Sequence, residues 1–507
     1  MLDLDGHSLT LLDLEQVVKG HEGARLGDAA RGRVTAARQL IEECVAQGRV
    51  IYGVTTGFGS FSEIAISPGQ LRQLQRNLLL SHAAGVGDPL PEPVVRAMLL
   101  LRANSLASGH SGVRPEVIDM LLALLEHRLH PVIPAKGSVG ASGDLAPLAH
   151  LALVLIGEGE AWAGGRRLPA ALALAEAGLH PLTLEAKEGL ALINGTQLIT
   201  ALGALAVLGA DRVSRAADVA AALTAEVLRG TDACFADHFA AVRPHPGHRR
   251  AAANLRRLVA GSRLIARPGE VRVQDPYVLR CAPQVHGASK DVSAHVRQVV
   301  EIELNAVTDN PLVFPEQGLV VSGGNFHGQP LALALDYLAM ALAEWSSIAE
   351  RRIERLLNRQ LSGLPAFLVE GGGLNSGFML AQYTAAALVS ENKVLCHPAS
   401  VDSIPTSANQ EDHVSMGAFA ARKANEVLAN AERVVAIELL CAAQALEFRG
   451  ADQAGPAGRA AHAAIRRVVA PREADRLLSP DIEAVADLVR SGRLLEAVES
   501  VVGRLEA

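Results

Sequence analysis

Apolar residues recur at helical spacing over long stretches of this chain. From Ala424 onward, Leu428, Ala431, Val435 and Leu439 follow at steps of three and four, and most charged residues of that stretch fall elsewhere. This periodicity predicts a long amphipathic helix. Similar patterns, each ended by a nearby Gly, Pro or Asn, predict further long helices over residues 196–228, 285–307 and 330–357. Long helices in succession favour a bundle.

The first 195 residues are more broken than the rest. Glycine and proline cluster there three times, at residues 53–59, 85–93 and 131–147, and such clusters are typical of loops. We therefore predict a mainly α fold with a loop-rich N-terminal domain over residues 1–195 and a bundle of long helices over residues 196–507. Near the C-terminus, Ser479-Pro480-Asp481 predicts a helix start, with Ser as the cap and Pro in the first helical position.

Composition agrees with helices and limits the partners. The 507 residues are rich in Ala and Leu and only 3% aromatic, which favours helices over strands. This length permits a large core and, by arithmetic alone, two to four domains. The net charge is −7, with basic and acidic residues mixed along the chain. No nucleic-acid or anionic-membrane partner is therefore expected.

The cysteines and the N-terminus indicate a cytoplasmic protein. The first residues, Met-Leu-Asp-Leu-Asp-Gly-His, place two acids where a signal peptide needs positive charge. Residues 189–210 carry no charged side chain, and the length of this stretch is close to the roughly 20 residues that span a bilayer. Polar residues crowd its first half, however, which predicts a loop that leads into a buried helix. The cysteines, odd in number and without a CxxC pair, argue against a disulfide framework and a Cys-based zinc site; they are Cys44, Cys234, Cys281, Cys396 and Cys441.

One glycine-rich segment carries candidate chemistry. From Gly137 to Pro147 the chain reads Gly-Ser-Val-Gly-Ala-Ser-Gly-Asp-Leu-Ala-Pro, and its glycines allow tight or strained backbone conformations. A flexible loop before a helix that starts near Asp144 is the simplest interpretation. A serine-hydrolase elbow requires Gly-x-Ser-x-Gly, whereas Gly143 directly follows Ser142. A phosphate-binding loop requires Lys-Ser/Thr after the glycines, which is missing here.

This segment resembles the Ala-Ser-Gly signature of the ammonia-lyases and aminomutases that carry a methylidene-imidazolone (MIO) group. The resemblance implies that Ala141, Ser142 and Gly143 form this electrophile autocatalytically. The Gly143 amide nitrogen would attack the Ala141 carbonyl carbon, a reaction made feasible by enforced proximity, and two waters would be lost, one of them from the Ser142 side chain. A helix beginning after Asp144 would direct its positive end towards the ring.

The resemblance covers nearly the whole chain and is greatest to the histidine-specific branch of the family. It implies that Tyr52, in Tyr52-Gly53-Val54-Thr55-Thr56-Gly57-Phe58-Gly59, acts in proton transfer near the substrate β-carbon, although a Tyr before a Gly-rich loop is more often structural. It implies that His82, in Ser81-His82-Ala83-Ala84-Gly85, holds the substrate side chain, although a lone His among Leu and Ala usually belongs to the core.

Three further residues are assigned by the same resemblance. Asn194 would lie beside the substrate and the electrophile, or could simply cap the following helix. Phe326 would pack against the electrophile. Glu411 points to an imidazole substrate, because aromatic-substrate members usually carry an uncharged residue there; the alternative is a solvated acid in the first turn of a helix.

The segment from Gln274 to Arg280 can be interpreted from its residues. Asp275 is expected to cap, Pro276 to open a helical turn, and Tyr277 and Arg280 to share a face. This pair could form a surface patch, but arginine is suited to gripping a carboxylate with two hydrogen bonds. The resemblance implies that Arg280 binds the substrate carboxylate, that Tyr277 assists electrophile formation or stabilises it, and that Gln274 completes the pocket.

Taken together, the resemblance implies a homotetramer with shared active sites that eliminates ammonia from L-histidine to give trans-urocanate, the first step of histidine degradation. Neither a metal nor a nucleotide is expected, because the chain has no HExxH and no dinucleotide fingerprint. Two questions of mechanism stay open: whether Tyr52 or Glu411 is the base, and whether the amine or the imidazole attacks the electrophile. Two alternative functions also stay open. These alternatives are a tyrosine or phenylalanine lyase or aminomutase, and a catalytically silent helical assembly protein.

Overall fold

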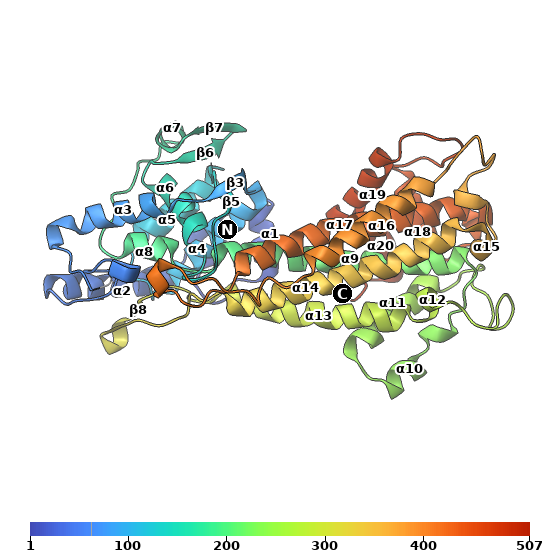
Figure 1. The fold of residues 1–507 in the computed structure, drawn as a ribbon, viewed down its shortest axis with the longest axis horizontal. Helices are drawn as coiled ribbons and strands as arrows, with labels where there is room; N and C mark the ends of the chain where they lie inside the picture. The colour runs from blue at the N-terminus through green and yellow to red at the C-terminus, as the bar shows by residue number, and fades with distance from the viewer. Residues whose placement is uncertain (62) are drawn as a thin grey trace. The chain divides into compact units, whose positions relative to one another are not determined.

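The computed structural model describes residues 1–61 and 63–507 and confirms a mainly α fold (Figure 1). The four long helical patterns are all confirmed; the boundaries of three differ by a few residues, whereas the helix predicted from Ala424 begins at Gly417 and continues to Arg449. The corresponding helices are α9 (Gln197–Val227), α13 (Ala282–Glu303), α14 (Gln329–Leu357) and α17 (Gly417–Arg449).

The chain groups into two compact units, each made of separate segments. The first unit comprises Met1–Leu205, Arg297–Leu335 and Pro398–Arg422, and the second comprises Ala206–Val296, Asp336–His397 and Lys423–Ala507. Two late segments thus pack with the N-terminal residues. The domain boundary that the sequence predicts between residues 195 and 196 stays a prediction.

The first unit surrounds a helix that is buried on every side. Residues 94–107 of α4 (Glu92–Ala107) are all buried, including Arg96 and Arg102. Its helices also include α1 (Leu11–Val18), α2 (Asp28–Ala46), α3 (Leu71–His82), α5 (Pro115–Glu126), α6 (Leu145–Leu155), α7 (Ala170–Glu176) and α8 (Glu188–Ile193). Because Pro91 precedes α4 and the next residues are mostly apolar, the helix begins in a defined place and its whole surface is suited to a core.

Short strands complete the first unit. β1 (Leu2–Leu4) pairs in parallel with β2 (Ala24–Leu26), in the register Leu2 to Ala24. The remaining pairs are antiparallel: β3 (Val86–Pro89) with β5 (Pro134–Lys136), β6 (Glu160–Ala163) with both β4 (His130–Pro131) and β7 (Arg166–Pro169), and β8 (Leu312–Phe314) with β9 (Leu319–Val321).

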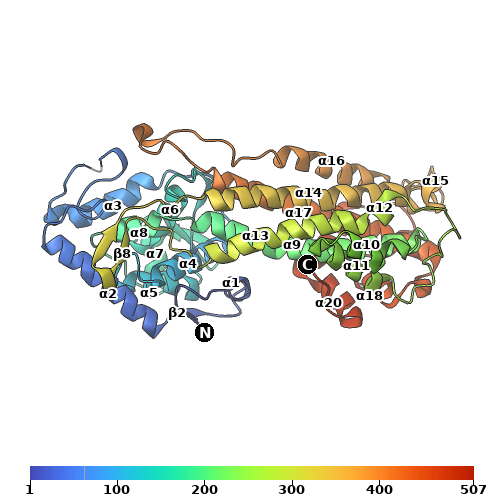
Figure 2. The same ribbon diagram turned by 90° about the horizontal axis from the view of Figure 1, so that it is seen from below.

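The second unit is a bundle in which the long helices run side by side, as both views show (Figures 1 and 2). Helix α19 begins at Ser479, so this Ser is the first helical residue, and not the cap that the sequence predicts. The shorter helices of the unit are α10 (Asp237–Val242), α11 (Pro246–Val259), α12 (Tyr277–Arg280), α15 (Arg359–Ser362), α16 (Met379–Leu395), α18 (Pro456–Arg466), α19 (Ser479–Ser491) and α20 (Arg493–Val502).

Two pairs of titratable side chains are buried inside the bundle. Arg352 donates two hydrogen bonds to Glu438, at 2.6 and 2.8 Å, and the Nδ1 atom of His286 lies 2.7 Å from Asp218. All four side chains are fully buried. Removing Arg352 or Glu438 would leave an uncompensated charge in the bundle, so this pair fixes how α14 and α17 meet.

The uncharged stretch at residues 189–210 is helical on both sides of a break, so the loop predicted in its first half is limited to residues 194–196. α8 ends at Ile193 and α9 begins at Gln197. Among the described residues, one helix, α14, is long and apolar enough to cross a membrane, and 67% of its most apolar window is buried within the structure. The five cysteines are all free, and the described residues contain no group of three or more metal-ligating side chains.

Candidate functional site

The site is built around the break between α8 and α9. Gly195, in the middle of this break, donates its N–H to the Ser142 carbonyl at 3.3 Å and accepts the Asp144 N–H at 2.7 Å. These two bonds tie the glycine-rich loop to the break. The backbone of Gly195 has φ +147°, a conformation that a side chain would strain.

The loop from Gly137 to Asp144 is tightly folded, as its composition predicts. Gly143 has φ +74°, and a β-carbon at this position would collide with the Gly195 carbonyl oxygen. The Ser138 hydroxyl donates to an Asp144 carboxylate oxygen at 2.9 Å. Helix α6 begins directly after Asp144, at Leu145, so the predicted helix start is confirmed.

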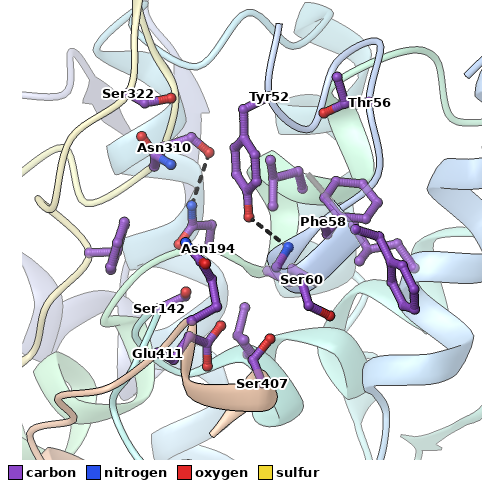
Figure 3. A pocket seen from close by; sticks show the side chains of 18 of the residues that line it. Tyr52, Thr56, Phe58, Ser60, Ser142, Asn194, Asn310, Ser322, Ser407 and Glu411 are labelled. Carbon is purple, nitrogen blue, oxygen red and sulfur yellow. Dashed lines mark hydrogen bonds between the residues drawn. The ribbon is translucent and has the colours of Figure 1, made fainter. Parts of the chain in front are cut away.

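A cavity of about 680 Å³ opens beside this loop, within the first unit (Figure 3). Figure 3 shows Tyr52, Ser142, Asn194 and Glu411 around the same space, although they come from four separate parts of the chain. Six residues singled out from the sequence line this cavity: Tyr52, His82, Ser142, Asn194, Phe326 and Glu411. Ala141 and Gly143 are buried on either side of Ser142.

Tyr52 is held by the loop that follows it. The Gly59 N–H donates to the Tyr52 hydroxyl oxygen at 3.2 Å, and the Phe58 ring meets the Tyr52 ring edge-on, with centroids 6.5 Å apart. Because the oxygen is the acceptor in that bond, the hydroxyl hydrogen stays available to a group in the cavity.

His82 is the last residue of α3. The Ser81 hydroxyl lies 3.0 Å from its Nδ1 atom. Burial lowers the pKa of His82, while the Leu78 backbone and the negative charge of Glu411 oppose this shift. The ring is therefore mostly neutral at pH 7 and is able to accept or donate a hydrogen bond in the cavity.

Asn194 has one satisfied and one free end. Its Nδ2 atom donates to the Asn310 carbonyl at 3.0 Å, whereas its Oδ1 atom is buried without a partner. The side chain therefore does not cap α9, which was the alternative interpretation. A buried amide oxygen that lines a cavity without a partner is suited to accept a hydrogen bond from a bound molecule.

Glu411 lies in a loop, not in the first turn of a helix, so that alternative for Glu411 is wrong. The Thr406 hydroxyl donates to its carboxylate at 2.9 Å, and the backbones of both residues pair across a tight turn. Within this turn Ser407, Ala408 and Asn409 all have left-handed φ values, of 51°, 53° and 67°. Such a conformation costs roughly 1–2 kcal/mol per residue, so the surrounding contacts must hold it.

The three remaining candidates lie in the second unit, and none of them lines the cavity described here. Arg280 stacks over the Tyr277 ring at 4.4 Å, so the predicted shared face is confirmed, and Tyr277 is 70% exposed. With its amide turned to suit, Gln274 accepts from the Arg280 Nε atom at 3.0 Å. Asp275 does not cap α12, because its carboxylate accepts from the Thr231 N–H at 2.7 Å and from Arg272.

Sequence reasoning missed the buried charges behind the cavity. Lys187 pairs with Asp309 at 2.7 Å, and both side chains are fully buried. Asp309 precedes Asn310, which lines the cavity. Arg102 donates to the Asn194 carbonyl. The one available signal was a charged residue within an otherwise apolar helical stretch, as for Arg102.

The glycine-rich loop fits the group that the resemblance implies. Ring closure between Gly143 and Ala141 requires a residue without a side chain at the attacking nitrogen, and the structure leaves no room for a β-carbon there. Ser142 lines the cavity, so a methylidene carbon derived from its side chain would face the open space. The free Asn194 oxygen supplies a polar partner nearby.

Comparison with known proteins gives consistent matches over the chain. A family model described as aromatic amino acid lyase matches residues 9–467. The histidine ammonia-lyase of Symbiobacterium thermophilum is 61% identical over 501 residues, 99% of either chain. The histidine ammonia-lyase structure from Trypanosoma cruzi is 48% identical with a TM-score of 0.92, covering 99% of this chain and 95% of that one. Tyrosine aminomutase from Streptomyces globisporus is 41% identical with a TM-score of 0.95, covering 99% and 98%.

Proposed function

Since the chain belongs to the aromatic amino acid lyase family, we propose that it is a histidine ammonia-lyase, which eliminates ammonia from L-histidine to give trans-urocanate. The observation that carries this proposal is the cavity that His82, Glu411 and Ser142 line together. Full-length identity of 61% and 58% to the histidine ammonia-lyases of Symbiobacterium thermophilum and Gloeobacter violaceus supports the same substrate.

The imidazole of the substrate would bind between His82 and Glu411. A mostly neutral His82 is able to exchange one hydrogen bond with the ring, and the Glu411 carboxylate is able to accept a ring N–H. The likeness to tyrosine aminomutase keeps one alternative open, namely a tyrosine substrate in the same cavity. A phenol ring offers no basic nitrogen, so a polar pair of this kind favours imidazole.

Ala141, Ser142 and Gly143 would supply the MIO group. Its formation joins the Gly143 nitrogen to the Ala141 carbonyl carbon. One water carries away the carbonyl oxygen with the amide hydrogens of Gly143 and Ser142, and the second carries away the Ser142 hydroxyl and the Ser142 α-hydrogen. When present, the group provides an electrophilic methylidene carbon, which ordinary side chains lack. The N-terminus of α6 lies directly after this loop and would favour negative charge there.

The other residues would bind and orient the substrate or move its proton. Arg280 would hold the carboxylate, Gln274 and Tyr277 would support that grip and the electrophile, Asn194 would accept from the amine, and Phe326 would pack against the reacting centre. The β-proton must be removed by a group placed against it. Tyr52 and Glu411 both line the cavity and share this role in the proposal.

We propose further that four copies assemble with shared active sites. The support is an apolar helix, α16, with little cover in a single chain: Leu380, Tyr383 and Val394 are 49%, 60% and 73% exposed. Exposed apolar side chains on one helix are typical of a surface that a partner buries. In such an assembly the Tyr277 and Arg280 pair of another copy would complete the site. The proposal includes a cytoplasmic location and needs neither metal nor nucleotide.

The decisive experiment follows urocanate by ultraviolet absorbance after L-histidine is added, with Ser142→Ala as the matched control. A rise that disappears in the control would support both the substrate and the electrophile. Absence of a rise in a folded sample, together with activity on tyrosine or phenylalanine, would transfer the proposal to the aminomutase or lyase alternatives. An unmodified intact mass in a folded wild-type sample would remove the electrophile, because the cyclised chain must be lighter by two waters.

A further inference from the structure

We propose that Arg102 is a positioning residue that holds the break between α8 and α9 in the geometry needed for MIO formation and for the Asn194 contact. This inference rests on the proposed function. Arg102 is fully buried in the middle of α4. Burial lowers its pKa to about 10, which leaves the guanidinium charged at neutral pH.

The guanidinium of Arg102 makes hydrogen bonds with uncharged acceptors at the two helix ends. It donates to the Ala191 carbonyl at 2.5 Å, to the Asn194 carbonyl at 3.0 and 3.1 Å, and to the Gln197 side-chain oxygen. Carbonyls at the end of a helix such as α8 have no partner within the helix. One planar group with several donors satisfies them and also reaches the first residue of α9.

The opposite side of the same break touches the reactive loop. Gly195 bonds to the Ser142 carbonyl and to the Asp144 N–H, and it lies against Arg102 so closely that a β-carbon on Gly195 would collide with the guanidinium. A single glycine therefore separates Arg102 from the backbone of the tripeptide. If Arg102 is displaced, it no longer packs against Gly195. The two hydrogen bonds between Gly195 and the loop are then displaced as well.

The same displacement would misdirect Asn194. Its carbonyl is fixed by Arg102 and its Nδ2 atom by the Asn310 carbonyl, so the free Oδ1 atom has one position in the cavity. Misplacement of a reacting or binding group by about 1 Å can reduce a rate by about 100-fold. Arg102 thus acts through Asn194 and Gly195 and does not touch the substrate.

Helix α4 offers a matched control six residues away. Arg96 is also buried and also donates to backbone carbonyls, those of Val17, Val18 and Leu125. These carbonyls lie at the ends of α1 and α5, and Arg96 does not line the cavity. Arg96→Gln therefore removes the same kind of buried structural arginine without disturbing the break.

The test compares Arg102→Gln, Arg102→Lys and Arg96→Gln with the wild type as full-length proteins checked for folding by circular dichroism. Intact mass gives the fraction cyclised against time, and kcat and KM are measured per cyclised chain. We expect Arg102→Gln to cyclise about 10- to 100-fold more slowly than the wild type. Its kcat should fall by a larger factor than its KM changes, while Arg96→Gln should cyclise fully. Arg102→Lys retains a charge but not the forked donors, so it should show a milder defect of the same kind.

The outcomes separate this inference from the proposed function. A folded wild type with unmodified mass overturns both. A cyclised wild type, together with Arg102 variants that cyclise at the wild-type rate and keep its kcat, overturns the inference alone. Equal slowing in Arg96→Gln also overturns it, because the effect would then be general destabilisation. If Arg102→Gln fails to fold, Arg102→Lys provides the same comparison.

Discussion

The Asp144 carboxylate accepts a hydrogen bond from the Ile199 N–H at 2.9 Å, so the residue directly after the reactive tripeptide caps the first turn of α9. Its own N–H donates to the Gly195 carbonyl at 2.7 Å. Burial raises the pKa of Asp144 to about 6, against the opposing hydrogen bonds from Ile199, Ser138 and Leu198. One side chain thus joins the loop before α6 to the start of α9, a helix of 31 residues.

Replacing Asp144 with Ala is expected to lower the free energy of unfolding by about 1–2 kcal/mol, because an N-terminal cap is lost. It should also leave part of the purified protein uncyclised, since the bond to Ser138 disappears. Asp144→Asn keeps one acceptor for the Ile199 N–H, so its free energy of unfolding and its cyclised fraction should both fall less than those of Asp144→Ala. Denaturation midpoints and intact masses check these results, and equal midpoints for Ala and Asn would contradict the capping role.

Glu226 gives a prediction about pH. It is buried in the second unit, where burial raises its pKa to about 7 from the ordinary 4.5, against a hydrogen bond from the Gly455 N–H at 2.7 Å. Because the folded pKa is raised, its contribution to stability is fully present below pH 4.5 and is lost as the pH rises through 7. Glu226→Gln cannot ionise, so it should match the wild type at pH 4.5 and be more stable at pH 8, by up to about 3 kcal/mol.

Melting temperatures at the two pH values would measure this effect, and Glu447 is a control of opposite sign. Burial opposes the shift there, but hydrogen bonds from His462 and Arg466 hold the pKa of Glu447 below its usual value. Its stabilising contribution is therefore present above the unfolded pKa and is lost as the pH falls. Glu447→Gln should destabilise at pH 8. If Glu226→Gln were less stable than the wild type at pH 8, Glu226 would not be a destabilising buried charge at that pH.

Tyr52 and Glu411, which line the same cavity, are the two candidates for removal of the β-proton in the proposed function. Tyr52→Phe and Glu411→Gln are each close in size to the original side chain, so the fold should persist. We expect the base to lose about 100- to 10,000-fold in kcat, and the other residue to change mainly KM if it orients the imidazole. Steady-state kinetics with L-histidine measure both. Full activity in both variants would show that neither Tyr52 nor Glu411 is the base.

Assembly can be tested on α16. Tyr383→Glu places a charge on the apolar face of that helix, where a partner subunit would have to bury it, so the variant should dissociate to smaller species. Light scattering coupled to size exclusion gives the mass in solution. A substitution at Val242, which is exposed outside α16, serves as the control. A Tyr383→Glu protein of unchanged mass would show that this face is not the interface.

The fold was largely predictable because its long helices are periodic in sequence. Residues 330–357 were expected as a helix, and α14 covers Gln329–Leu357. Spacing did not predict that residues 297–335 and 398–422 pack with the N-terminal part, because this depends on distant contacts. The buried Lys187 and Asp309 pair is one such contact, 122 residues apart in the chain.

The site was predictable only in part. Glycines in the loop around Ser142 indicated a tight turn, and the family resemblance singled out Tyr52 and Glu411, which do line the cavity. Sequence reasoning could not assign a support role to Arg102, because its acceptors, apart from the Gln197 side chain, are backbone carbonyls, which every residue possesses. Nor could it foresee the left-handed turn before Glu411, since Ser407 and Ala408 show no preference for that conformation.

The complete burial of α4 has a consequence for the timescales of the site. Amide hydrogens between residues 94 and 107 should exchange with deuterium only when the whole unit unfolds, because no face of the helix opens to solvent locally. The loop after Tyr52 lies outside the α-helices and strands, so we expect its amide hydrogens to exchange sooner than those of α4. We therefore expect slow exchange in α4, which Arg102 connects to Asn194, and faster exchange in the loops around Tyr52 and Glu411. In the proposed function these loops would govern entry of the amino acid, while α4 would hold Asn194 in place over the lifetime of the fold.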